Sequence, residues 1–300
     1  MADAEPQQLA AEGAQRRRVA VLSIVAALLL TGGEVWSAVI QSKFPTIGLL
    51  QGLKPALNGL QAAAVDPRTA HEQFLVHHQV PLILASVLML LAWIVIIVPL
   101  RYLAAAERIR SSMPSSFTGY LAQYAPLLIA IFVPASEVGL IIGAHSYLSG
   151  TARTAAAVSA ATGGGVRVVI QLFAIVGQLG AAVAIILISL RAMRVGLLTR
   201  ALGIIGIIAG VLFVIPLTPV PLLPVWLVFL GAMLFGFGGR PLPEAWTSGE
   251  ARPWPSQQST RAQRRPARPA RGARPAPATP EPAMPRGPSP SASKKRKRRR

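Results

Sequence analysis

The sequence predicts an all-α protein, a bundle of six transmembrane helices followed by a disordered basic tail. Three observations support this prediction. Repeated uncharged stretches of about 20 residues are each long enough to cross a hydrocarbon core of ~30 Å. Arginines flank these stretches so that most of the positive charge falls on one side of the expected membrane. Residues 251–300 hold 15 of the 30 Lys and Arg residues and a single acid, Glu281.

The expected elements follow one another in chain order. A polar N-terminal segment, residues 1–18, comes first, and its first 15 residues are expected to be disordered. The transmembrane domain covers residues 19–238. The last two spans are short, so they should cross nearly upright or thin the bilayer locally. The six spans are expected at about 19–41, 80–103, 120–148, 166–190, 201–216 and 221–237.

Two segments follow the last span. Residues 239–256 form a juxtamembrane stretch in which Trp246 and Trp254 are expected to act as interfacial anchors. Residues 257–300 are dominated by Pro, Arg, Ala and Ser and have almost no large apolar side chain. This tail should therefore be disordered, with polyproline character.

The arginines also predict orientation, because cytoplasmic loops retain Lys and Arg. Both termini should be cytoplasmic, which makes this a multi-pass protein of the cell inner (cytoplasmic) membrane. A secretory signal peptide is the alternative for the first span, but no cleavage site follows Leu30 cleanly. The arginines in question are Arg16, Arg17 and Arg18 before the first span, Arg101, Arg108 and Arg110 after the second, Arg191, Arg194 and Arg200 after the fourth, and Arg240 after the sixth.

Local patterns predict two further features. Thr69 and Glu72 have the spacing of a capping box, which predicts a helix that starts there and runs into the second span, with a kink near Pro81. Gly33-Glu34-Val35 resembles Ser136-Glu137-Val138, so a 2+2 parallel repeat followed by a C-terminal hairpin is plausible. Chance similarity between apolar helices is the alternative explanation for the repeat.

Glu34 and Glu137 are the sharpest candidates for chemistry, as carboxyls expected within the membrane. Each lies about 15 residues into its span, ~22 Å along the helix. Such a carboxyl should face the bundle and be protonated or partnered. The pair could bind a proton or cation, or could simply fasten helices together. Gln171 and Gln178 share a face of the fourth span, and Gln178 could hydrogen-bond Glu137 or act as interhelical glue.

Other patterns carry weaker signals. Cysteine is absent, which excludes disulfides and thiolate chemistry. His71 and His78 share a helical face beside Glu72, but their spacing matches no standard metal motif. Gly206 and Gly210 form a small-xxx-small pattern that favours packing within the bundle. No catalytic arrangement is recognisable, so neither an enzymatic activity nor a cofactor or metal is expected.

The basic terminus has three interpretations. It could contact the anionic headgroups of membrane lipids, or bind nucleic acid through phosphates. No aromatic residue follows Trp254, so nucleic-acid binding would be independent of base sequence. The third interpretation is a tail that only reinforces cytoplasmic retention. The cluster consists of Lys294, Lys295, Arg296, Lys297, Arg298, Arg299 and Arg300.

The juxtamembrane segment Arg240-Pro241-Leu242-Pro243-Glu244-Ala245-Trp246, with Pro253-Trp254-Pro255-Ser256, carries a resemblance to a known group. It resembles uncharacterised integral membrane proteins of high-GC, actinobacterial-type bacteria, which also have a segment similar to residues 191–200 and a basic tail. The resemblance spans about residues 15–256. It implies a multi-pass architecture and no assigned activity.

We therefore expect a non-enzymatic membrane protein whose basic cytoplasmic tail contacts anionic lipid or another polyanion. The alternative is a small proton- or cation-coupled transporter that uses the intramembrane carboxyls. The sequence does not identify protein partners.

Overall fold

The computed structural model describes residues 4–45, 68–112, 115–215, 222–237 and 242–254, which form helices joined by turns, without a strand. The expected tail, residues 257–300, with its cluster Lys294–Arg300, lies outside the described residues, as does Arg240. The all-helical class is confirmed for the part of the chain that the structure describes.

Four helices are long and apolar enough to cross a membrane, which supports the expected class of membrane protein. The shortest of them has 30 residues and a length of ~45 Å, well above the ~30 Å of a hydrocarbon core. These helices are α1 (Ala4–Gln41), α4 (Gln79–Arg110), α5 (Ser116–Ser149) and α7 (Gly165–Arg194).

The expected disorder of the first 15 residues is wrong, because α1 already begins at Ala4. This segment is rich in Ala, Glu and Gln, which are strong helix formers. It also extends an existing helix, so it avoids the costly nucleation of a new one. The prediction of disorder rested on the polarity of residues 1–15 alone. In the structure α1 extends from the apolar stretch back into this polar segment.

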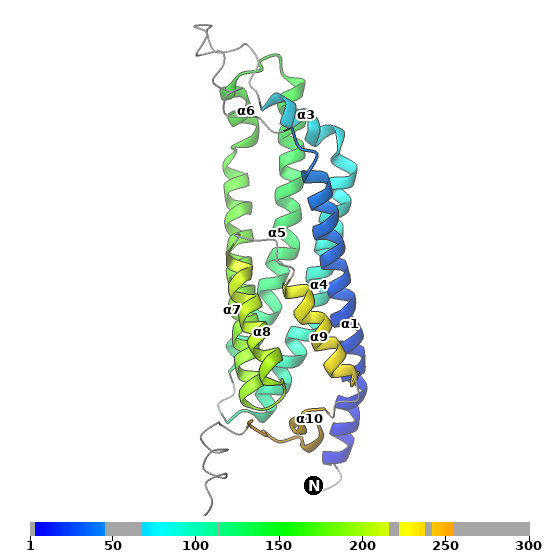
Figure 1. Ribbon diagram of the computed structural model, residues 1–300. Helices are drawn as coiled ribbons and strands as arrows, with labels where there is room; N and C mark the ends of the chain where they lie inside the picture. Colours follow the sequence, from blue (N-terminus) through cyan, green and yellow to red (C-terminus); the bar gives the residue numbers. More distant parts are fainter. Residues whose placement is uncertain (1–3, 46–67, 113–114, 216–221, 238–241, 255–300) are drawn as a thin grey trace, which may run out of the picture. The chain divides into compact units, whose positions relative to one another are not determined.

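Two shorter apolar helices, α8 (Arg200–Val214) and α9 (Leu222–Phe235), complete the bundle. The helices pack in the cyclic order α1, α4, α5, α7, α8, α9 and back to α1 (Figure 1). In Figure 1 α8 and α9 lie beside only the lower part of the long helices. The buried core gathers here, around Trp226, Ile185 and Leu100.

The α8–α9 pair reaches about halfway along its neighbours. The side chain of Gln178, near the middle of α7, donates to the carbonyl of Phe213 at the end of α8, at 2.9 Å. The ring of Phe213 also lies 5.3 Å from that of Trp93, near the middle of α4. With 15 and 14 residues, the two helices are ~22 Å long at most, shorter than a hydrocarbon core.

Glycines allow α8 to approach its neighbours closely. A Cβ on Gly206 would clash with the Ser189 hydroxyl of α7 and would lie 2.6 Å from the Trp226 indole nitrogen of α9. A Cβ on Gly210 would lie 3.0 Å from the Ala182 carbonyl oxygen of α7. The small-xxx-small pattern therefore serves packing inside one chain, as the sequence favoured.

The opposite end of the bundle is closed by α3 (Thr69–His77), and α6 (Ala155–Thr162) packs against α5. The expected capping box is not formed, because the Thr69 hydroxyl bonds the Tyr147 hydroxyl of α5 at 2.6 Å. The expected kink near Pro81 is a break at His78, which separates α3 from α4. The contact with Tyr147 thus engages the Thr69 hydroxyl that the capping box would require.

The contact at Gly206 predicts that a single methyl group disturbs the bundle. We expect Gly206→Ala to lower stability by about 1–3 kcal/mol, since overpacking shifts Trp226 and Ser189. Gly139→Ala is the matched control, because nothing lies within 4 Å of a Cβ at Gly139. Unfolding of the purified protein in detergent, followed by tryptophan fluorescence, measures both changes. Equal stability of the two variants would contradict the packing assigned to Gly206.

Candidate functional site at the arginine-rich end

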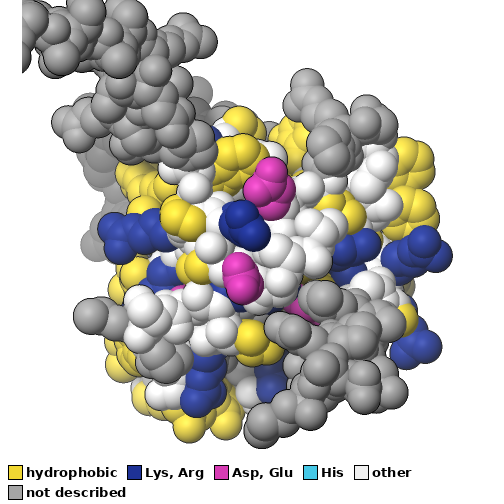
Figure 2. Space-filling view, turned by 90° about the horizontal axis from the view of Figure 1, so that it is seen from below, with side chains coloured by type: hydrophobic (Ala, Val, Ile, Leu, Met, Phe, Trp, Pro, Cys, Tyr) yellow, Lys and Arg dark blue, Asp and Glu magenta, His cyan; other side chains and the backbone are white. Residues whose placement is uncertain are grey.

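One end of the bundle collects segments that are far apart in the sequence. The beginning of α1, the α4–α5 connection, the α7–α8 turn and the short helix α10 (Glu244–Ser248) all lie at this end (Figure 1). Figure 2 looks onto it and shows Lys and Arg side chains around much of the rim and also near the middle, where acidic side chains lie beside them. The described arginines that the sequence assigned to one side of the membrane do belong to one end of the structure, while Arg240 lies outside the described residues.

Arg110 connects three of these segments. Its side chain is only 1% exposed and pairs with the Glu12 carboxylate of α1 at 3.0 Å. The same guanidinium donates to the carbonyl of Ala245 in α10 at 2.9 Å and to that of Ala106 in α4 at 3.2 Å. A buried charge is stable only when it is paired and hydrogen-bonded, and here both conditions are met.

Trp246 docks α10 onto the bundle. Its indole nitrogen donates to the carbonyl of Leu197, in the α7–α8 turn, at 2.8 Å. Its ring stacks on Tyr102 of α4, with 5.6 Å between centroids, and lies 5.4 Å from the Arg110 guanidinium carbon. Trp246 is 4% exposed, so the expected interfacial anchor is a buried packing residue instead.

The chain after α10 continues along the same turn. The Trp254 indole donates to the carbonyl of Leu198 at 2.9 Å, and the Arg252 amide donates to that of Val195 at 3.0 Å. Gly196 has φ +82°, and the Arg252 carbonyl oxygen occupies the place where a Cβ would lie. Only glycine meets both requirements, so Gly196 lets the juxtamembrane segment lie against the turn.

The sequence missed this docking. Arg110 looked like any other flanking arginine, and Glu12 fell in a segment expected to be disordered. The one available signal was the pair of tryptophans in a Pro-rich stretch, and it supported an interfacial anchor equally well.

The two intramembrane carboxyls lie on different parts of the bundle. Glu34 is on α1 and Glu137 is on α5, and both are partly buried. Each of these helices packs on α4, while α1 and α5 share no extensive interface. No hydrogen bond or ion pair joins Glu34 to Glu137 among the described residues, so the structure does not bring them together as a pair.

Gln171 and Gln178 also lie in different surroundings. Gln178 is partly buried and uses its amide to hold α8, which is the role of interhelical glue that the sequence offered as an alternative. Gln171 is exposed on α7. The hydrogen bond from Gln178 to Glu137 is not seen.

Arg167 of α7 lies near two carboxyls at the opposite end. Its charge acts on Glu137 and on Glu72 of α3, and its guanidinium donates to the carbonyl of Thr162 at 2.6 Å. Burial raises the pKa of the Glu72 carboxyl, and the charges of His71, Arg167 and Arg68 only partly oppose this shift. The hydrogen bond of Arg167 therefore joins the start of α7 to the end of α6.

The histidines near α3 are engaged in ring contacts. His71 stacks on Phe44 with 4.6 Å between centroids, and His78 stacks on Phe74 at 3.9 Å. No group of three metal-binding side chains occurs in the described part of the chain. Comparisons of this chain with protein-family models, with curated proteins and with solved structures find no match.

The buried contacts of Arg110 predict a strong effect of its removal. We expect Arg110→Gln to lower stability by about 3 kcal/mol, because Glu12 is left without its partner. This is the low end of the range for buried pairs, since 24% of the Glu12 side chain stays exposed. Unfolding in detergent measures the change, and limited proteolysis after residue 242 reports the release of α10. Arg108→Gln, at an exposed arginine of the same helix, should leave both readouts unchanged.

Proposed function

We propose that this protein is a non-enzymatic, multi-pass protein of the inner (cytoplasmic) membrane that presents its basic tail at the cytoplasmic face, where the tail contacts anionic lipid. The observation that supports this proposal is the docking of residues 242–254 at the arginine-rich end. Trp254, the last residue that the structure describes, is bonded to this arginine-rich end. Both termini are cytoplasmic in this proposal, in accord with the bias of charge.

Lipid is favoured over nucleic acid by geometry and by composition. Trp254 is bonded at the end of the bundle where the membrane surface is expected, so in this proposal the anionic surface is the nearest polyanion. Each basic residue near such a surface contributes roughly 1 kcal/mol before screening. The tail has no aromatic residue for stacking on bases, so nucleic acid would bind only through phosphates.

The number of membrane crossings is part of the proposal. Six crossings follow from the sequence, and four helices of membrane length follow from the structure. We propose that α8 and α9 enter and leave the membrane at the arginine-rich end, because Phe213 meets Gln178 only halfway along α7. This arrangement keeps both termini on one side, as six crossings would. The parallel repeat of α1–α4 and α5–α7 stays a prediction.

Cysteine labelling tests the number of membrane crossings. Single cysteines can be introduced directly, because the natural chain has none. In intact cells a membrane-impermeant maleimide should label Gly150→Cys and should fail to label Thr218→Cys, between α8 and α9. A denatured sample provides the control for the reactivity of each thiol. Labelling of Thr218→Cys equal to that of Gly150→Cys would establish six crossings and refute the shorter hairpin.

The tail is tested in the full-length protein, reconstituted into vesicles. A fluorophore on Ser293→Cys should lie close to the headgroups of anionic vesicles, as measured by energy transfer to labelled lipid. Most of the attraction of the seven terminal cations should disappear by about 0.5 M salt, because the Debye length falls from ~8 Å towards 3 Å. The matched control replaces Lys294–Arg300 with Gln. Equal proximity in neutral vesicles, or in high salt, would contradict the proposal.

A further inference from the structure

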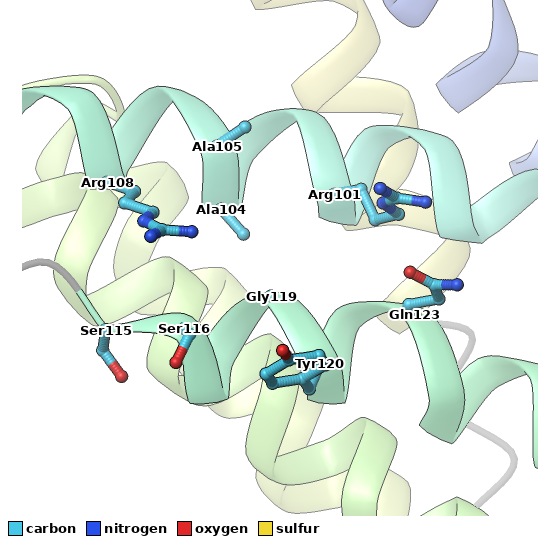
Figure 3. Close-up of a pocket in the computed structure, with 9 residues that line it drawn as sticks. All are labelled: Arg101, Ala104, Ala105, Arg108, Ser115, Ser116, Gly119, Tyr120 and Gln123. Carbon is cyan, nitrogen blue, oxygen red and sulfur yellow. The ribbon is translucent and has the colours of Figure 1, made fainter.

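A pocket lies between α4 and α5 at the arginine-rich end (Figure 3). Its volume is about 260 Å³. Arg101 and Gln123 lie at one end of it, and Arg108 lies at the other end with Ser115 and Ser116. Tyr120 and Gly119 of α5, with Ala104 and Ala105 of α4, complete the lining.

The polar groups of the pocket can all donate hydrogen bonds. Two guanidinium groups, three hydroxyls and one amide line it, without a carboxylate among the described lining residues. Arg101 and Arg108 are exposed, and neither has a hydrogen bond or ion pair to another described residue. By contrast, Arg153 and Arg167 at the opposite end donate to backbone carbonyls. Unpaired guanidinium groups beside hydroxyls favour a phosphate, which accepts several charge-assisted hydrogen bonds.

The start of α5 adds to this preference. Ser116 is the first residue of α5, and the capping residue Ser115 makes no side-chain cap hydrogen bond. The first N–H groups of a helix lack partners within it and carry partial positive charge, so they attract anions. Gly119 leaves the floor of the pocket open, because nothing lies within 4 Å of a Cβ built on it.

The surface beyond the pocket is apolar. On α4 the exposed residues Leu91, Ile94 and Val98 continue the helical face that carries Arg101 and Arg108, at spacings of three and four residues. On α5 Tyr124 and Ile131 continue the face of Tyr120. A ligand with a phosphate at the arginines and acyl chains along these residues matches both parts of the surface.

We propose that this pocket binds the phosphate headgroup of an anionic phospholipid, with its acyl chains lying along the outer face of α4 and α5. The site belongs to the helical bundle and is separate from the basic tail. It would hold one lipid at a defined place, whereas the tail would contact the surface by charge alone.

The test uses the full-length protein in an uncharged detergent. Native mass spectrometry and thermal unfolding report the binding of added phosphatidylglycerol, phosphatidylcholine and inorganic phosphate. We expect phosphatidylglycerol to bind and to stabilise the protein. Phosphatidylcholine should bind about tenfold more weakly, because it keeps the phosphate but adds a quaternary ammonium group, whose positive charge is repelled by the two guanidinium groups. Inorganic phosphate should bind weakly, because it makes no apolar contacts.

Two kinds of variant disrupt the proposed binding site in different ways. Arg101→Gln with Arg108→Gln removes the charge, and Gly119→Leu fills the space while the charge stays. Both should weaken phosphatidylglycerol binding by about tenfold or more. Arg17→Gln with Arg194→Gln is the control for charge, and Gly139→Leu is the control for an added side chain in open space on α5. Unfolding without lipid verifies that each variant is folded.

The outcomes separate this site from the tail. If replacement of Lys294–Arg300 with Gln leaves the difference between parent and pocket variants intact, the site is independent of the tail. Parent-like binding of phosphatidylglycerol by both pocket variants would overturn the proposal and leave the tail function standing. Saturation by inorganic phosphate with no preference for the lipid would also overturn it, in favour of a soluble anion.

Discussion

The buried guanidinium of Arg110 is the interaction on which the arginine-rich end depends. It pairs with Glu12, bonds the carbonyl of Ala245 and lies over the ring of Trp246. These contacts join the beginning of α1, the end of α4 and the segment after the last apolar helix. A lone buried charge would be costly, so each partner is needed by the others. The docking of α10 therefore depends on one side chain.

A second constraint is the difference in length between the helices. The four long helices exceed the thickness of a hydrocarbon core, while α8 and α9 fall short of it. The short pair is held at one end by close glycine contacts at Gly206 and Gly210, and by the amide of Gln178. These contacts lie in the half of the bundle where the juxtamembrane segment also docks.

The arginines of the two ends are used differently. At the end with α3, Arg153 donates to the carbonyls of Tyr147, Leu148 and Gly150, which terminate α5. At the other end, Arg110 is buried and paired with Glu12, while Arg101 and Arg108 line the pocket. Position in the sequence does not separate these roles, because all three follow the same apolar span. The roles of the three arginines differ in burial and in hydrogen-bond partners, and these properties exist only in the folded chain.

The sequence by itself predicted the helical class, six apolar spans, of which four are helices of membrane length, and the gathering of arginines at one end, because hydrophobic length and charge bias act along the chain. It also predicted that Gly206 and Gly210 pack within the bundle. It did not predict the docking of Trp246, the helix before residue 16 or the absence of the capping box at Thr69. The docking of Trp246 and the lost capping box each depend on a partner far away in the chain, Leu197 and Tyr147, whereas the helix before residue 16 follows from local helix formers that extend α1. Only the tertiary structure decided the docking and the lost capping box, because a donor bonds whichever acceptor folding brings near, and local spacing does not encode that choice.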